Sequence, residues 1–355
     1  TLLLSLPFAH VSEGGFTFFE ALFTATSAVT VTGLTVCDVH STFSIYGEVI
    51  VLLLIQLGGL GILTLSSVII LLITKKISFY TKRLVSEGLN HEGYTMHWGM
   101  NIIISLLVIF GGLGFTAIIE LYEYLIGKRR KISVNSKFST LITLLLLGMG
   151  TFLFFILEYR YTGELTDGSV QQRLLVSFFH SASLRTAGFS TVSIAGISGT
   201  TALLCMLLMF IGASPNSTGS GIKTTTFGIL YLGVRTSLLN KRYIEYSKRR
   251  ISWQLFNKAS TLVFIASSYI MIMAILMMYF DRDKEPIKVL FELMSAFSTC
   301  GLSMGLTSWL STPSQVILLI TMFLGRVGPL TIVLAFSRER NVGKYKYPKE
   351  NILIG

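Results

Sequence analysis

The sequence contains TVTGL at residues 30–34, RTAGF at residues 185–189 and STCGL at residues 298–302. Each of these glycine segments precedes an apolar run that carries a second glycine, and the second glycines are Gly58, Gly212 and Gly325. The two glycines of a pair are 25, 24 and 24 residues apart. This repeated spacing predicts a unit made of a loop that re-enters a membrane and a helix that crosses it. Several such units around one axis would form an ion pore.

Composition places the chain in a lipid bilayer. It is 52% hydrophobic and 13% charged, with a mean hydropathy of +0.68, whereas a soluble domain has about 25% charged residues. Uncharged apolar runs at 102–119, 141–157 and 259–280 are near the roughly 17–25 residues that a crossing helix needs. Longer apolar runs lie at 49–74, 202–234 and 316–336. We therefore expect a multi-pass membrane protein.

The net charge of +11 has a specific distribution. Basic residues cluster directly after apolar runs, at 75–83, 128–131, 241–250 and 338–346. This is the pattern in which the basic ends of membrane helices lie in the cytoplasm, and it places the C-terminal tail there too. Attraction to anionic lipid is a second use for these clusters. We expect no nucleic-acid partner.

The run at 102–119 does not fit a simple count of crossings. It is the only apolar run between two basic clusters, and one crossing cannot join two cytoplasmic ends. QLGGLGI at 56–62 and IFGGLGF at 109–115 are near copies, so this run is the second helix of its own repeat. We expect the preceding helix and glycine segment of that repeat to be missing near 90–97, and the first helix of the first repeat to be missing before Thr1. Gly88 has the right spacing to Gly112, but its surroundings are too charged for a pore segment.

These patterns predict an all-α polytopic membrane protein with four helix–pore-loop–helix repeats in a pseudo-fourfold arrangement around one ion pore. Repeat 1 spans 1–83 (pore loop 16–36, inner helix 45–75), and the remnant of repeat 2 spans 84–131 (inner helix 101–124). Repeat 3 spans 132–250 (outer helix 138–159, pore loop 174–192, broken inner helix 200–240). Repeat 4 spans 251–340 (outer helix 255–280, pore loop 288–303, inner helix 314–337), and a cytoplasmic tail follows at 341–355.

The glycine segments are our candidate ion filter. The apolar stretches before them, at 16–28, 174–183 and 289–297, are too short to cross the membrane. Irregular backbone at that depth is tolerated where it lines water, and rings of backbone carbonyls coordinate dehydrated monovalent cations. The candidate filter residues are Thr30, Val31, Thr32, Gly33, Thr186, Ala187, Gly188, Ser298, Thr299, Cys300 and Gly301. One such segment alone would be an ordinary turn, but the matched spacing of three favours a pore.

Charged side chains near the segments limit the kind of filter. No Asp or Glu lies within them, and Glu20 and Glu292 lie earlier at different offsets, which argues against a calcium-type carboxylate filter. Arg185 would repel cations if it faced the ion. We expect it to point away from the pore and to pair behind the filter.

The apolar run at 202–234 is interrupted by GASPNSTGSG at 212–221. Pro215 removes a helix hydrogen bond, and glycines favour coil. A nucleotide-binding P-loop is excluded because Ile222 separates Gly221 from Lys223. We interpret this gate loop as an intramembrane segment that can block conduction; a static kink is the alternative. Its residues are Gly212, Ala213, Ser214, Pro215, Asn216, Ser217, Thr218, Gly219, Ser220 and Gly221.

Arg326 lies within the last apolar run, next to Gly325. An arginine at that depth is costly and usually functional. We predict that it faces the interior, contacts carbonyls of the gate loop and helps to hold the gate. Pairing with a lipid headgroup or a buried carboxylate is the alternative.

Other classes of function find little support. Cys37, Cys205 and Cys300 are isolated, which argues against a zinc site or a disulfide framework. His180 stands alone in a short apolar stretch, and Glu158 lies at a helix end. We therefore predict no catalytic residues, no enzyme activity and no covalently bound cofactor.

These residues resemble a known family. FEALFTATSA at 19–28, TGLT at 32–35, RTAGF at 185–189 and GSGIKTTT at 219–226 are similar to the KtrB family, the membrane subunits of bacterial Ktr potassium uptake systems, which belongs with the Trk and HKT transporters. The resemblance covers nearly the whole chain. It departs from the family where the first helix is cut short and where the second repeat lacks its outer helix and filter glycine.

The resemblance implies one pore per subunit and a homodimer in the bacterial plasma membrane. It implies potassium selectivity from one glycine per repeat, which places potassium at Gly33, Gly188 and Gly301. It also implies a cytosolic KtrA-type ring that binds nucleotide, docks on the cytoplasmic face and C-terminal tail, and controls the gate.

The alternative is a sodium-selective or sodium-coupled transporter of the same superfamily, with sodium as substrate or activator. Among HKT relatives a serine in place of a filter glycine goes with sodium transport, and the three visible positions are glycine. Sodium coupling, the regulatory ligand, the second repeat's filter residue and the state of the gate stay open at this point.

Overall fold

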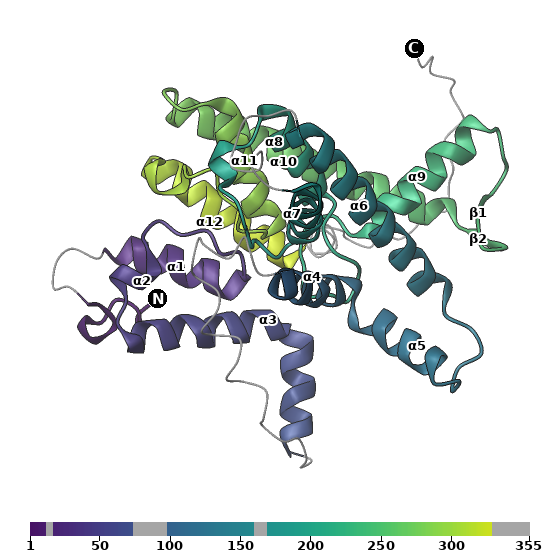
Figure 1. The fold of residues 1–355 in the computed structure, drawn as a ribbon, viewed down its shortest axis with the longest axis horizontal. Coiled ribbons are helices and arrows are strands. Elements are labelled where there is room, and N and C mark those ends of the chain that lie inside the picture. The colour runs from purple at the N-terminus through teal and green to yellow at the C-terminus, as the bar shows by residue number, and fades with distance from the viewer. Residues whose placement is uncertain (12–16, 74–97, 160–168, 329–355) are drawn as a thin grey trace, which may run out of the picture.

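The computed structural model describes residues 1–11, 17–73, 98–159 and 169–328 (Figure 1). The expected break near 90–97 and the tail at 341–355 lie outside these residues, as does the end of the inner helix expected to reach 337.

Helices dominate the described chain. They are η1 (Pro7–Ala9), α1 (Phe18–Thr30), α2 (Val39–Thr42), α3 (Ile45–Ile73), α4 (Trp98–Leu113), α5 (Phe115–Leu125), α6 (Val134–Tyr159), α7 (Val170–Ser183), η3 (Ile194–Gly196), α8 (Gly199–Phe210), α9 (Thr224–Leu238), α10 (Trp253–Phe280), α11 (Pro286–Ser298), η4 (Thr307–Trp309) and α12 (Thr312–Val327). A small antiparallel hairpin, β1 (Ile244–Tyr246) and β2 (Arg249–Ile251), follows α9 and pairs Ile244 with Ile251.

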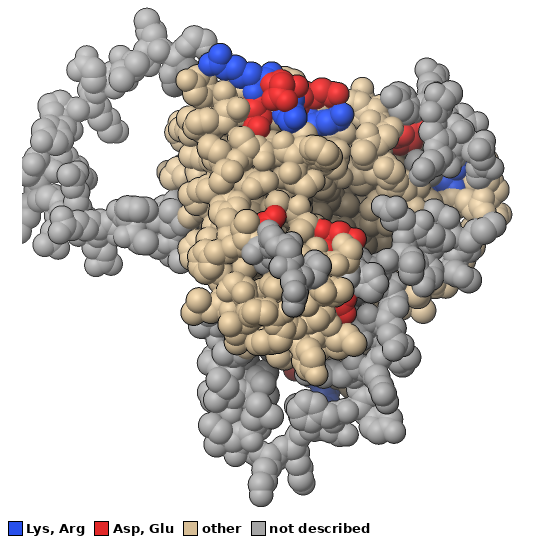
Figure 2. Space-filling model, turned by 90° about the vertical axis from the view of Figure 1, so that its left-hand side faces the viewer, with Lys and Arg blue, Asp and Glu red and all other residues tan. Residues whose placement is uncertain are grey.

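Among the described helices, α6 and α10 are individually long and apolar enough to cross a membrane. The outer side of α10 carries exposed apolar side chains, including Phe264 (72% exposed) and Met271 (64% exposed). Figure 2 shows a face that is mostly free of charge, with its largest group of charged side chains at the upper edge. A helix with an apolar outer surface is suited to lipid, because hydrocarbon cannot solvate polar groups.

Three short helices precede the glycine segments, as the sequence predicts. They are α1, α7 and α11, of 13, 14 and 13 residues. Capping boxes begin the first two: Thr17 with Glu20 at α1, and Ser169 with Gln172 at α7. Such boxes satisfy backbone N–H groups that have no partner within the helix. The short helices therefore have well-defined starts and lead directly into the glycine segments.

Three inner helices, α3, α8 and α12, start just after a serine that is hydrogen-bonded to the element preceding the pore loop or the helix. The Ser311 amide and hydroxyl donate to the Asp281 carboxylate, both at 2.9 Å, at the start of α12. The Ser198 amide donates to Glu158 Oε1 at 3.3 Å, at the start of α8. Before α3, Ser44 donates instead to backbone carbonyls of η1. The same junction thus occurs three times with different acceptors.

One expected helix is broken. We predicted a continuous inner helix at 101–124, but α4 and α5 meet at an angle of 103°. Gly114 between them has a φ of +84°, which glycine adopts without steric cost. The near copy in α3 keeps helical backbone through its own glycines, although α3 turns sharply partway along in Figure 1. At Gly114 the neighbour is the gate loop, since a side chain there would overlap the carbonyl of Pro215.

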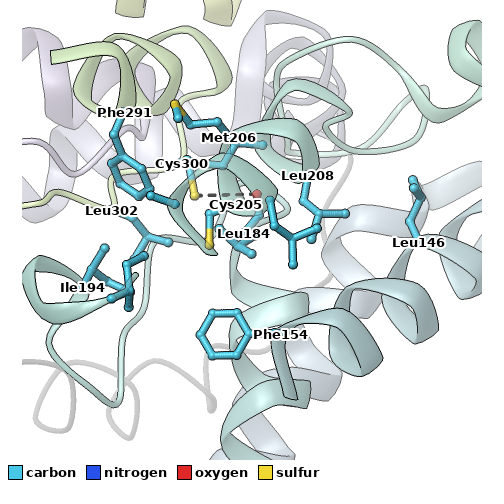
Figure 3. Close-up of a cluster of buried hydrophobic side chains, with 14 of the residues drawn as sticks. Leu146, Phe154, Leu184, Ile194, Cys205, Met206, Leu208, Phe291, Cys300 and Leu302 are labelled. Carbon is cyan, nitrogen blue, oxygen red and sulfur yellow. Dashed lines mark hydrogen bonds between the residues drawn. The ribbon is translucent and has the colours of Figure 1, made fainter. Parts of the chain in front are cut away.

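The core lies around the short helices. One buried cluster joins α6 and α8 to the glycine segment at 298–302 and includes Phe154, Leu184, Cys205 and Cys300 (Figure 3). A second joins α10, α11 and α12 and includes Met277 and Leu318. In Figure 1, α4 and α7 lie side by side near the centre. The packing therefore surrounds the glycine segments with helices from every part of the described chain.

Candidate ion-conduction site

The three glycine segments, numbered 1, 3 and 4 after their repeats (residues 30–34, 185–189 and 298–302), come together in space. A side chain on Gly301 would overlap the carbonyl oxygen of Thr32, and a side chain on Gly188 would overlap that of Cys300. Gly33 lies near the Cα of Gly301, which is 3.7 Å from the position of an added Cβ. The segments therefore follow one another in the order 1, 4, 3, each packing its backbone on the next glycine.

The backbone has the same unusual form in all three segments. The glycines have φ values of +93°, +74° and +88° in segments 1, 3 and 4. The residues two positions earlier, Val31, Thr186 and Thr299, have φ values of 55°, 73° and 50°. Left-handed backbone is uncommon outside glycine, and such strain collects at functional sites. The repeated strain marks these segments as the candidate site.

The amides of the segments are tied back into the short helices. Gly33 N–H donates to Ser27 Oγ at 3.1 Å, and Gly301 N–H donates to Ser295 Oγ at 3.0 Å, each six residues earlier. Gly188 N–H donates to the Ser183 carbonyl at 3.3 Å. By contrast, no described residue donates a hydrogen bond to the carbonyl oxygens of 31–33, 186–188 or 299–301. These carbonyls are available to another ligand.

The second glycines explain the spacing in the sequence. A side chain on Gly58 would overlap the Val29 carbonyl, and one on Gly325 would overlap the Phe297 carbonyl. Val29 and Phe297 each lie four residues before their segment glycine, so repeats 1 and 4 share one contact between inner helix and short helix. Gly212 departs from this pattern because its close neighbour is Ser220, within the gate loop.

The gate loop is a folded segment between α8 and α9. Ile222 N–H donates to the Phe210 carbonyl at 3.1 Å, which closes the base of the loop. The loop also docks on the bend between α4 and α5. Ser214 N–H donates to the Gly112 carbonyl at 2.9 Å, and Phe115 N–H donates to the Asn216 carbonyl at 3.1 Å.

Two basic side chains, Arg326 and Lys223, donate hydrogen bonds to carbonyls of the gate loop. Arg326 donates from Nη1 to the Thr218 carbonyl and from Nη2 to the Gly58 carbonyl. It therefore bridges the gate loop and α3 from its place in α12. Lys223 Nζ donates to the Gly219 carbonyl at 2.6 Å. Sequence reasoning missed this role of Lys223, although its place within an apolar run was the same signal that singled out Arg326.

Arg185, the first residue of segment 3, reaches to α6. Its side chain is 4% exposed, and Nη2 donates to Thr143 Oγ1 of α6 at 3.2 Å. Its Nε has no hydrogen-bond partner among the described residues. Arg185 also lines a cavity of about 290 Å³, together with Thr186, Gly111 and Thr218. The cavity thus touches α4, segment 3 and the gate loop.

Glu292 supports the chain that follows segment 4, a role that sequence reasoning missed. Its carboxylate accepts hydrogen bonds from Ser303 Oγ at 2.6 Å, Thr307 Oγ1 at 2.7 Å and the Met304 amide at 3.0 Å. A buried carboxylate within an apolar half-helix was the available signal, since such groups are rare unless they are needed.

The chain matches a family of known proteins. A family model described as "TrkH: Cation transport protein" matches residues 3–97 and, separately, residues 94–346. The chain belongs to this TrkH family of cation transport proteins. The two matched parts of the TrkH model meet at 94–97, where the count of crossings places a missing segment.

Relatives of this TrkH-family chain include two proteins named Ktr system potassium uptake protein B. That of Vibrio alginolyticus is 32% identical over an alignment covering 100% of this chain and 91% of the relative. That of Bacillus subtilis (strain 168) is 30% identical, covering 100% and 93%. The potassium/sodium uptake protein NtpJ of Enterococcus hirae is 30% identical, covering 99% and 93%. The first alignment has 422 positions for 355 residues, so at least 67 positions (422 − 355) have no residue in this chain.

A solved structure shares the fold. The potassium transporter TrkH from Vibrio parahaemolyticus matches with a TM-score of 0.68 and 18% identity, over 91% of this chain and 79% of that one. Together with the helices described above, this confirms the predicted all-α polytopic fold. The TrkH-family chain is a multi-pass membrane protein.

Proposed function

We propose that this protein is the potassium-translocating subunit of a bacterial Ktr-type uptake system. The observation that carries the proposal is the set of filter carbonyls. The glycine N–H groups of segments 1, 3 and 4 donate hydrogen bonds to residues of the short helices. The carbonyl oxygens of 31–33, 186–188 and 299–301 accept no hydrogen bond from the described residues. Carbonyls that accept no hydrogen bond from the protein can take another ligand, and a ring of backbone carbonyls suits a dehydrated monovalent cation.

Potassium is the favoured ion. Glycine stands at 33, 188 and 301, and the close backbone contacts at Gly188 and Gly301 leave no room for a side chain. The names of the Ktr relatives support potassium uptake. The alternative is sodium-selective or sodium-coupled transport. The name of the Enterococcus hirae relative, a potassium/sodium uptake protein, is consistent with that alternative.

The loop at 212–221 is the proposed gate. Arg326 holds it to α3 through the Thr218 and Gly58 carbonyls. A positive charge there also discourages cation leak through the closed pore. In the alternative, the loop is a static kink, and its release from Arg326 would leave uptake unchanged.

The proposed partners follow from the same relatives. The words "Ktr system" describe a system of several components, which supports a partner subunit. We propose from the family resemblance that this partner is a cytosolic nucleotide-binding ring and that the membrane subunit forms a homodimer. The basic residues after α9 supply a docking face on the proposed cytoplasmic side, since Arg249 and Arg250 of the small hairpin are exposed. In this arrangement the C-terminal tail is cytoplasmic and the lipid bilayer surrounds the apolar belt.

The test is rubidium uptake into proteoliposomes, with potassium or sodium as competitor. We expect potassium to inhibit uptake by the wild type far more strongly than sodium does. Gly33→Ser should reduce that difference, because the serine side chain strains a backbone with a φ of +93° and adds a hydroxyl to the filter. Equal competition by both ions in both proteins would rule out the filter assignment.

A further inference from the structure

Four polar side chains join the candidate filter to the gate loop. Arg185 Nη2 donates to Thr143 Oγ1 at 3.2 Å. The Thr143 and Ser214 hydroxyl oxygens are 3.4 Å apart. Thr224 Oγ1 donates to Ser214 Oγ at 3.1 Å. The chain of bonds therefore runs from segment 3 through α6 to the gate loop and on to the start of α9.

All four side chains are buried. Arg185 is 4% exposed, and Thr143, Ser214 and Thr224 are 0% exposed. Buried polar groups keep hydrogen-bond partners because an unmade bond is costly, and networks in such surroundings are stronger than isolated bonds in water. A displacement of Ser214 therefore cannot leave Thr143 and Arg185 undisturbed.

Of the four residues, Thr143 alone lies outside segment 3, the gate loop and α9. Because its oxygen accepts from Arg185, its own proton is free to be donated to Ser214. We propose that Thr143 is a positioning residue that couples the gate loop to filter segment 3, so that movement of the loop changes the ion preference of the filter. This inference rests on the proposed function.

A second contact joins the same two elements. A side chain on Gly219 of the gate loop would overlap Thr186 Oγ1 of segment 3. Thr218 lines the same cavity as Arg185 and Thr186. The loop therefore meets segment 3 both through hydrogen bonds and through direct packing, and the two contacts lie on different parts of the loop.

The experiment compares Thr143→Val with Thr143→Ser. Valine keeps the branched shape and removes the hydroxyl, whereas serine keeps the hydroxyl. Thr151→Val is the matched control, because Thr151 lies further along α6 and donates at 2.7 Å only to the Leu147 carbonyl of its own helix. Ser214→Ala tests the same bond from the loop side if Thr143→Val does not yield folded protein.

Two readouts separate coupling from a general loss of structure. The first is the ratio of sodium to potassium concentrations that halve rubidium uptake in proteoliposomes. The second is the rate at which a maleimide labels Thr218→Cys, in a Cys37→Ser background, which reports access to the exposed part of the loop. We expect Thr143→Val to change both by several-fold, and Thr143→Ser and Thr151→Val to match the parent protein.

Thr143→Val that matches the parent in both readouts would overturn the inference, as would an equal change in Thr151→Val. If the parent protein shows no potassium-sensitive uptake, the proposed transport function fails. The labelling rates then still decide whether Thr143 holds the loop.

Discussion

The carbonyl oxygen of Thr32 occupies the place that a side chain on Gly301 would fill. The same relation joins the Cys300 carbonyl to Gly188. Direct backbone packing at Gly301 and Gly188 thus sets the distance from segment 1 to segment 4 and from segment 4 to segment 3. At Gly33, the described residues leave more room, since an added Cβ would be 3.7 Å from the nearest atom.

The first prediction compares two filter glycines. Both have a positive φ, so an alanine at either position costs about 1–2 kcal/mol in backbone strain. Only Gly301→Ala also pushes against the Thr32 carbonyl. We therefore expect Gly301→Ala to lose more potassium preference than Gly33→Ala, measured as sodium and potassium competition for rubidium uptake. Equal losses would show that packing between the segments does not set selectivity.

The second prediction concerns Cys300. Its thiol donates to the Ser183 and Leu184 carbonyls at 3.6 and 3.7 Å, which ties segment 4 to the end of α7 (Figure 3). Cys300→Ala should weaken potassium preference, because segment 4 loses this attachment. Cys205→Ala is the matched control, since Cys205 is equally buried in the same cluster. A similar change in both variants would contradict the specific role of Cys300.

The third prediction concerns the glycines of the inner helices. Alanine at Gly58 or Gly325 would overlap the carbonyl of the adjoining short helix, and forced overpacking of this kind costs roughly 1–3 kcal/mol. We expect both variants to unfold at lower temperature in detergent. Gly148→Ala in α6 has no neighbour within 4 Å of the added Cβ and should be neutral or stabilising, because alanine favours the helix.

The spacing of the glycine pairs could be predicted from sequence because it reflects a short-range contact. Gly58 meets Val29 and Gly325 meets Phe297 within one repeat, so a fixed distance along the chain records each contact. The bend at Gly114 could not be predicted in this way. The helix is interrupted where the gate loop packs on Gly114, and that loop lies about 100 residues further along the chain.

The polar contacts that support the filter could not be predicted either, because they join residues that are far apart in the sequence. Thr143 meets Ser214 from 71 residues away, and Arg185 meets Thr143 from 42 residues away. That Arg185 points away from the pore stays a prediction, and no sequence pattern named Thr143 as its partner. Glu292 accepts hydrogen bonds from residues beyond its own helix. The spacing of the glycines does not predict these contacts.

The fourth prediction concerns the gate. Arg326→Ala removes the donors to the Thr218 and Gly58 carbonyls and frees the loop from α3. We expect faster rubidium uptake in proteoliposomes without any partner ring. Arg326→Lys should restore only part of the closure, because a lysine lacks the planar fork that reaches two carbonyls at once. Uptake no faster in Arg326→Ala than in the wild type would argue against a closing role.

The central claim is that backbone carbonyls of the glycine segments bind potassium in preference to sodium. Calorimetric titration of the purified wild-type protein, in a detergent buffer free of alkali cations, measures this without transport. We predict saturable binding of potassium and rubidium, and sodium binding that is weaker by at least an order of magnitude. Equal binding of sodium and potassium, or saturable binding of neither, would contradict the account.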